Sequence, residues 1–195
     1  SLHDISIDPS GHMLEYYPAL FCGLRPGEIL SLRYENYDPN MRTLFIREEY
    51  TKEDHLPGMK TPDQSVTYCF RHLNQAEHTP FHLKVPEFIC RQLNERIWQN
   101  EQFFHQHPNR ENPKAFCLSA RGTIKVLPTL NVQLKQIAKE NALPSISMLD
   151  LRYMHIYLLM QKGLDYDDIA TSMHLSPARI KYLCLLILDN IPEED

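Results

Sequence analysis

The sequence predicts an α+β fold that is mainly α-helical and contains a small antiparallel β-sheet. First, apolar residues recur at helical spacing along most of the chain. Second, three short segments are rich in β-branched and aromatic residues and predict strands: 43–47, 65–70 and 81–85. Third, 43% hydrophobic and 23% charged residues describe a globular chain, and 195 residues suit a single domain.

Each helix is predicted from its apolar periodicity and from the residues that begin or end it. Ser, Thr, Asp or Pro precedes or opens most of these segments, as is typical of helix N-termini, and Gly follows two of them. We expect helices over 10–22 beginning at Ser10, after Pro26, from Pro86 to Ile97, from Thr129, over 151–160, from Asp165, and from Ser176-Pro177 to about Asp189. The polar segments 51–64 and 99–113 predict a hairpin tip and a surface loop, respectively.

The cysteines and histidines indicate neither disulfides nor a metal site. None of the five cysteines forms a C-x-x-C pair, and most lie beside large apolar residues. We therefore expect buried free thiols and a cytoplasmic location. His105 and His107 have no Cys or His partner at ligand spacing, so we expect a polar loop there and no metal. No apolar run is long enough for a membrane helix, so no membrane partner is expected.

The charge balance bears on nucleic-acid binding. The chain has 20 basic and 25 acidic residues, which gives a net charge of -5. Because DNA affinity depends largely on neutralising phosphates, this balance argues mildly against strong duplex binding, although it is compatible with a local basic face.

Three segments, in this order, resemble the tyrosine recombinases (phage integrases). The segment 22–32 resembles the family's T-G-L-R-x-x-E-L-L-x-L box, with Arg25 and Glu28 matching. Lys60 lies in a predicted strand–turn–strand, where the family has a lysine. Leu149-Asp150-Leu151-Arg152 resembles the H-D-L-R box, with the second arginine at Arg152. The intervening segments also fit, so the resemblance covers nearly the whole chain.

The resemblance implies a recombinase catalytic core over residues 1–195, with an N-terminal DNA-binding domain expected upstream of this sequence. In the family, a tyrosine hydroxyl attacks a DNA phosphodiester and forms a 3′-phosphotyrosine link. Arg25 and Arg152 would hold the phosphate oxygens, and Lys60 would protonate the leaving 5′-oxygen. His174 and Tyr182 are the candidate histidine and nucleophile. DNA is the implied partner, a mobile element is the implied context, and no cofactor is implied.

The sequence also departs from the family's pattern. The histidine of the H-x-x-R motif falls on Leu149, which can neither move a proton nor bind a phosphate. In an alignment without gaps, the histidine of the L-G-H box falls on Leu175, one residue after His174.

The position of the family's tyrosine nucleophile also holds a different residue type in this alignment. The ungapped alignment puts it at Cys184, two residues after Tyr182. Two residues on a helix turn a side chain by roughly 200°. A short deletion before His174 would bring both His174 and Tyr182 close to register, so either Tyr182 or Cys184 could hold this position.

Three functions are compatible with these observations. The first is an active DNA strand-transferase. The second is a catalytically impaired relative that binds DNA or acts as a regulatory protein-interaction module, and the missing histidines favour it. The third is a helix-turn-helix reader over 168–180, for which only Arg179 and Lys181 supply basic groups. The apolar segment 183–188 indicates packing, in this domain or against another copy or a partner recombinase.

Overall fold

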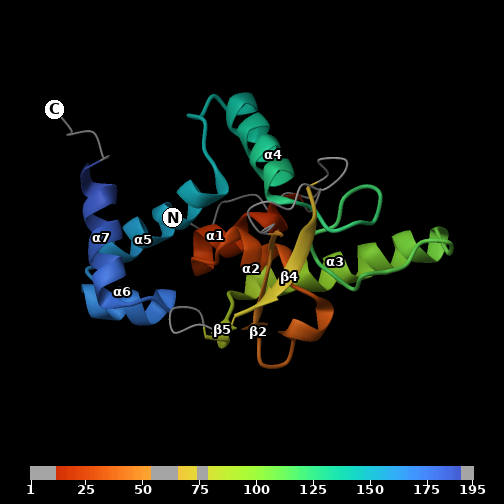
Figure 1. Cartoon of the computed structure of the whole chain (residues 1–195), viewed down its shortest axis with the longest axis horizontal. Coiled ribbons are helices and arrows are strands. Elements are labelled where there is room, and N and C mark those ends of the chain that lie inside the picture. The colour runs from red at the N-terminus through yellow and green to blue at the C-terminus, as the bar shows by residue number, and fades with distance from the viewer. Residues whose placement is uncertain (1–11, 54–65, 74–78, 190–195) are drawn as a thin grey trace, which may run out of the picture.

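The structure is a computed structural model that describes residues 12–53, 66–73 and 79–189 of the chain. Its helices lie around two small sheets (Figure 1). The helices are η1 (His12–Glu15), α1 (Tyr17–Cys22), α2 (Pro26–Leu30), η2 (Tyr34–Asn36), α3 (Glu87–Gln106), α4 (Leu127–Glu140), α5 (Met148–Gln161), α6 (Tyr166–Met173) and α7 (Pro177–Asp189). The predicted fold class, mainly α-helical with a small antiparallel sheet, is confirmed.

The strands form two antiparallel sheets. One has the order β1 (Tyr37–Asp38), β2 (Thr43–Ile46), β5 (Phe81–Lys84), and the other pairs β3 (Glu48–Lys52) with β4 (Tyr68–His72). In the second sheet Glu48 lies opposite His72 and Lys52 lies opposite Tyr68, so the chain between β3 and β4 leaves at the Lys52 end. Lys60 belongs to that connection and lies outside the described residues.

Two apolar clusters hold the fold together. The larger joins α1, α2, β2, α3 and α4, and its most deeply buried side chains include Ile29, Leu44 and Ile89. The smaller is built by α5, α6 and α7 around Ile156, Ile169 and Ile180. In Figure 1 this helical group lies at one end of the molecule and α3 extends toward the other.

Several helix boundaries differ from the prediction. The first predicted helix is split into η1 and α1, and its expected cap Ser10 lies outside the described residues. Helix α3 continues to Gln106, so the loop predicted from 99 was wrong over its first part. Helix α4 begins at Leu127 with Val126 as its N-cap, so Thr129 lies inside the first turn. Asp165 was predicted correctly: its side chain accepts a hydrogen bond of 2.8 Å from Asp168 N.

The strand prediction missed β3. Residues 43–47 and 81–85 form strands as expected, but they pair with each other, as β2 and β5, whereas the predicted hairpin joined 43–47 to 65–70. The predicted strand 65–70 corresponds to β4, but its neighbour is the polar segment Glu48–Lys52. The sequence predicts no strand there, and residues 51 and 52 belong to the predicted hairpin tip. Tyr50 lies opposite Phe70 in this pair, with ring centroids 4.9 Å apart. Cross-strand aromatic contact of this kind stabilises a strand whose other residues are polar or charged.

The cysteines are free thiols, as predicted. Cys22, Cys90, Cys117 and Cys184 are buried and Cys69 is half-buried. Burial raises the pKa of Cys22 to about 12, and of Cys117 likewise to about 12. These thiols are therefore protonated and unreactive at neutral pH. Over the described ranges, the chain forms no helix that is long and apolar enough for a membrane span.

Candidate phosphate-binding site

Arg25 lies at the N-terminus of α2. Its extended backbone (φ -74°, ψ 150°) ends the turn after α1, and Pro26 opens the helix with the φ that its ring imposes. The Arg25 N–H donates a 2.7 Å hydrogen bond to Oε2 of Glu28, one turn into the helix. Glu28 is buried, so this bond fixes the backbone from which the half-buried Arg25 side chain projects.

Arg152 lies in the second turn of α5. The helix begins at Ser147, whose Oγ and N–H both donate 2.7 Å bonds to Oδ2 of Asp150. Asp150 is therefore a capping residue of this helix. Arg152 is buried, with 8% of its surface exposed, and its Nε donates a 2.8 Å hydrogen bond to the carbonyl oxygen of Gly23.

Arg25 lies close enough to Arg152 for its charge to act on the Arg152 guanidinium. Burial lowers the pKa of Arg152 to about 10, and the positive charges of Arg25 and Arg179 act in the same direction. The carboxylate of Glu28 opposes this change in pKa. Burial likewise raises the pKa of Glu28, although Arg25 and Arg152 both counteract it. Residues 25, 28 and 152, distant in sequence, thus form one electrostatic cluster, which we call the arginine cluster.

Gly23 makes the close approach of α1 and α5 possible. It has φ +67° and ends α1 in the left-handed conformation. A Cβ here would lie 2.5 Å from Sδ of Met173 and 2.8 Å from Cδ2 of His155. His155 Nδ1 lies 2.9 Å from the carbonyl oxygen of Leu20, so α5 is bonded to the end of α1 through two side chains. Gly23 therefore permits the close packing of these side chains, in addition to ending α1.

The β3–β4 hairpin approaches the same helix end. A Cβ added at Gly27 would lie 3.2 Å from Cβ of Glu49 and 3.4 Å from the carbonyl oxygen of Tyr50. Strand β3 therefore packs against the start of α2, beside Arg25. Lys60 is in the connection that follows this strand, outside the described residues.

His174 ends α6 in the left-handed conformation, with φ 51° and ψ 45°. Its ring stacks on Phe81, with centroids 3.7 Å apart, and burial lowers its pKa below the usual 6.5. A left-handed C-terminal position favours glycine, and glycine is the family's residue here in the ungapped alignment of the L-G-H box. The backbone therefore supports that alignment.

Tyr182 and Cys184 occupy opposite environments on α7. Tyr182 is 56% exposed, and the guanidinium carbon of Arg179 lies 5.3 Å from its ring centroid. Cys184 is fully buried in the smaller apolar cluster. Within the part of the chain that the structure describes, the ring contacts of His174 and Tyr182 are with Phe81 and Arg179, and not with Arg25 or Arg152.

Arg179 was not among the predicted site residues. It lies in the first turn of α7, and its N–H donates a 3.3 Å hydrogen bond to Oγ of Ser176. The sequence analysis considered it only for a helix-turn-helix. Its guanidinium acts electrostatically on Arg152 while lying against Tyr182, so it connects α7 with the arginine cluster. No sequence pattern specific to this role was available, because the role depends on how α7 packs on α5.

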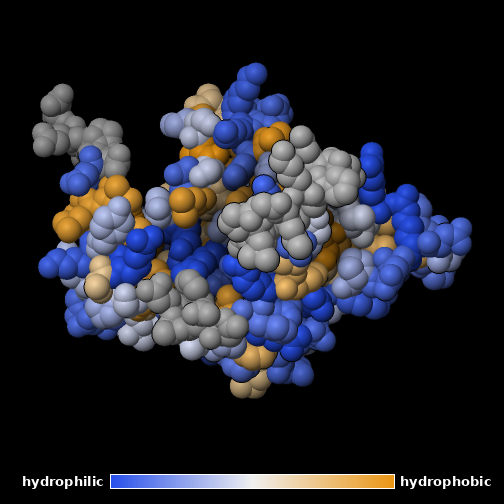
Figure 2. Space-filling model, in the orientation of Figure 1, coloured by the Kyte–Doolittle hydropathy of each residue, from blue (hydrophilic) through white to orange (hydrophobic). Residues whose placement is uncertain are grey.

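Hydrophobic and hydrophilic areas lie side by side on the molecular surface near α7. Figure 2 shows hydrophobic surface over α7 at one end of the molecule, beside a hydrophilic band. On α7, Leu185 and Leu188 are each 48% exposed. On α5, Leu149 is 45% and Met154 46% exposed. Leu149, where the family has a histidine, thus offers an apolar side chain to the surface.

The chain was compared with known proteins at the level of sequence and of structure. No protein-family model matches it, and no curated protein matches it. Solved structures do match. An integrase of the Tn1549 transposon in complex with transposon right-end DNA has a TM-score of 0.67 at 13% identity, over 89% of this chain and 54% of that one.

Two further solved structures are recombinases. The XerA recombinase has a TM-score of 0.58 at 12% identity, and the match covers 95% of this chain and 59% of the XerA chain. The XerH site-specific recombinase, in a post-cleavage complex with a palindromic substrate, has a TM-score of 0.56 at 14% identity, over 87% of this chain and 40% of that one. The chain thus spans about half the length of these proteins, and it has the catalytic-domain fold of the tyrosine recombinases.

Proposed function

We propose that this domain binds DNA in site-specific recombination or integration, gripping a backbone phosphate with Arg25 and Arg152, and that its own strand cleavage is impaired. The observation that carries the proposal is the arginine cluster. Two guanidiniums from distant helices lie around one buried carboxylate, and Arg152 is held in place by a main-chain carbonyl.

The electrostatics of the cluster favour an anionic ligand. Arg25, Arg152 and Arg179 bring three positive charges against the carboxylate of Glu28 and that of Glu49 beside it. Burial lowers the pKa of Arg152, and the like charges of Arg25 and Arg179 lower it further. A phosphate would offset this repulsion and accept hydrogen bonds from the planar guanidiniums.

Impaired cleavage follows from the groups that surround the cluster. In the register supported by the backbone at His174, the two histidine positions are Leu149 and Leu175 and the nucleophile position is Cys184. The Cys184 thiol is fully buried and burial raises its pKa, so it is a poor nucleophile. Tyr182 is exposed beside Arg179, and is the hydroxyl that remains accessible in the register of a short deletion.

DNA is the partner that the comparisons favour. The Tn1549 integrase and XerH structures are DNA complexes, and the former acts in a transposon, which suggests a mobile element as the context here. The net charge of -5 requires that binding depend on local basic groups such as the arginine cluster. The buried free thiols favour a reducing compartment, and hence the cytoplasm.

A second candidate is a regulatory module that pairs with another copy or with an active recombinase. The observation in its favour is the exposed apolar surface of α7 and α5, at Leu185, Leu188, Leu149 and Met154. Scattered exposed apolar residues are common, but these lie on two helices that pack together. This module could bind DNA or act through protein contacts alone.

The test measures cleavage and binding separately. The protein is incubated with nicked DNA substrates that trap a covalent protein–DNA adduct, and with duplex DNA in a low-salt gel-shift titration. We expect a gel shift that weakens in Arg25→Ala and Arg152→Lys, and no adduct. An adduct that forms with the wild type, is weakened in Lys60→Ala and is lost in Tyr182→Phe would show an active recombinase instead. Absence of any gel shift, with self-association intact, would favour the protein-interaction module.

A further inference from the structure

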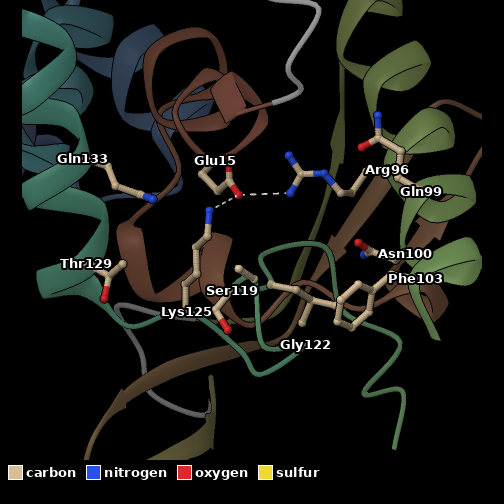
Figure 3. A pocket seen from close by; sticks show the side chains of 12 residues that line it. Glu15, Arg96, Gln99, Asn100, Phe103, Ser119, Gly122, Lys125, Thr129 and Gln133 are labelled. Carbon is tan, nitrogen blue, oxygen red and sulfur yellow. Dashed lines mark hydrogen bonds and ion pairs between the residues drawn. The ribbon is translucent and has the colours of Figure 1, made fainter. Parts of the chain in front are cut away.

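Arg179 lies against an aromatic ring and not against a carboxylate. Its guanidinium carbon is 5.3 Å from the ring centroid of Tyr182, and over the described ranges no carboxylate forms an ion pair with it. Figure 3 shows the contrasting arrangement in a cavity beside α3 and α4, where Arg96 and Lys125 both donate to Oε1 of Glu15. An aromatic ring attracts a guanidinium without neutralising its charge. Arg179 therefore presents a full positive charge at the surface.

The contact between Arg179 and Tyr182 belongs to the beginning of α7. Residues three apart on a helix are neighbours on its surface. Both side chains are exposed, whereas Ile180 between them is fully buried in the smaller apolar cluster. The N–H of Arg179 also donates a 3.3 Å hydrogen bond to Oγ of Ser176. The backbone at Arg179 is thus held in place while its side chain stays accessible to a ligand.

Helix packing brings Arg179 toward the arginine cluster. Ile180 of α7 and Ile156 of α5 are both fully buried in the smaller apolar cluster. Arg179 directly precedes Ile180, and Arg152 lies about one helical turn before Ile156. Burial lowers the pKa of Arg152, and the positive charges of Arg25 and Arg179 lower it further. Arg179 therefore lies within electrostatic range of an anion bound at Arg152.

The family's histidine positions supply no hydrogen-bond donor in this chain. In the ungapped register they hold Leu149 and Leu175, whose side chains cannot bind a phosphate oxygen. A phosphate held by Arg25 and Arg152 alone would lack those contacts. A guanidinium carries five N–H donors in a planar arrangement that matches phosphate oxygens. Arg179 can therefore replace the missing donors.

We propose that Arg179 is a third ligand of the DNA phosphate bound by Arg25 and Arg152, and that the ring of Tyr182 holds Arg179 in place. The inference rests on the proposed function, since it assigns two further residues to the same phosphate site. Tyr182 is a positioning residue that acts through its ring, and phosphate binding does not need its hydroxyl. A nucleophile needs the hydroxyl, so the two roles of Tyr182 are separable by substitution.

Fluorescence anisotropy with a duplex DNA probe, at several sodium chloride concentrations, tests both residues. Arg179→Ala should weaken binding and reduce the slope of log K against log salt by about 1, because one phosphate contact is lost. Tyr182→Ala should weaken binding about two- to fivefold, the range of an exposed cation–π contact. Tyr182→Phe keeps the ring and should bind like the wild type. Both positions are exposed, so the variants should fold, and circular dichroism checks this.

A double variant shows whether Tyr182 acts through Arg179. In the Arg179→Ala background, Tyr182→Ala should weaken binding no further; an equal loss in both backgrounds would overturn the positioning role. Lys181→Ala, which removes a positive charge from another exposed position of α7, is the matched control and should leave the salt slope unchanged. If Lys181→Ala and Arg179→Ala reduce the slope equally, α7 contacts DNA as a helix-turn-helix reader would, and the inference is wrong.

The same measurements separate this inference from the proposed function. If the wild type binds DNA and Arg25→Ala weakens binding but Arg179→Ala does not, the proposed phosphate site stands and the third ligand is wrong. If Tyr182→Phe binds as weakly as Tyr182→Ala, the hydroxyl makes the contact and the positioning role is wrong. If the wild type binds no duplex DNA, the proposed function fails and this inference fails with it.

Discussion

The guanidinium of Arg152 donates a hydrogen bond of 2.8 Å from Nε to the carbonyl oxygen of Gly23. The two residues are 129 positions apart in the sequence. The bond occupies the inner edge of the guanidinium and leaves the two terminal nitrogens for other partners. Because the acceptor is main chain, the orientation of Arg152 depends on the backbone conformation at Gly23.

Gly23→Ala should therefore destabilise the domain by more than about 2 kcal/mol, since it adds strain at positive φ to a clash with packed side chains. The added methyl would lie 2.5 Å from Met173 Sδ. Gly163→Ala is the matched control: φ is +80°, but no atom lies within 4 Å of the added Cβ. It should cost only about 1 kcal/mol. Urea unfolding measures both, and equal losses would contradict the packing role of Gly23.

Arg25→Ala should weaken binding to duplex DNA of any sequence and reduce the slope of log K against log salt by about 1. One phosphate contact is lost, and with it about one released counterion. Fluorescence anisotropy at several salt concentrations measures the slope. Arg91→Ala, which removes an exposed arginine of α3, is the control and should leave the slope unchanged. An unchanged slope in Arg25→Ala would mean that this arginine does not contact phosphate.

His155 should make the domain less stable in acid. Burial lowers the pKa of His155 below 6.5, with Lys162 and Arg152 acting in the same direction. The folded state therefore binds this proton less readily than the unfolded state. The stabilising contribution is present above pH 6.5 and is lost as the pH falls through the lower folded-state pKa.

The difference in unfolding free energy between wild type and His155→Gln measures this effect. Between pH 7.5 and pH 5, wild type should lose more stability than the variant. Other titrating groups cancel in the comparison. Parallel pH profiles for the two proteins would show that His155 does not titrate differently on folding.

Cys184→Tyr places a tyrosine where the ungapped alignment puts the family's nucleophile, and it should not create a recombinase. The thiol is fully buried among Ile156, Ile169 and Leu183. A phenol there overpacks the cluster, and we expect a loss of about 1–3 kcal/mol. Tyr182→Phe, at an exposed position of the same helix, should change stability by less than about 0.5 kcal/mol. Thermal unfolding ranks the two; a stable Cys184→Tyr protein that forms a DNA adduct would refute impaired cleavage.

The sequence predicted the fold class and the two arginines because both leave local patterns. Apolar periodicity identifies helices such as α5 and α7 directly. Arg25 and Arg152 stand in short motifs whose spacing could be read along the chain. Their proximity, however, came from the family resemblance and not from any property of the residues themselves.

Other features could not be predicted because tertiary contacts override local preference. Helix α3 continues through a segment rich in Gln and Asn because Asn100 and Phe104 extend the buried face that Gln92 and Arg96 begin. Arg96 bonds to Glu15 and the amide of Asn100 donates to Ala115 O. A search for apolar periodicity misses such a buried polar face. The role of Arg179 was hidden for a related reason, since it depends on α7 packing beside α5.

The main-chain anchor of Arg152 has an evolutionary consequence. A guanidinium oriented by a neighbouring histidine or tyrosine would lose its orientation when that neighbour is substituted. A guanidinium that is hydrogen-bonded to a peptide carbonyl would keep its orientation. If the proposed function holds, the family's catalytic groups at positions 149, 175 and 184 can be replaced by aliphatic or thiol side chains while the proposed phosphate binding is kept. A lineage built this way can abandon chemistry and keep a use for its binding surface.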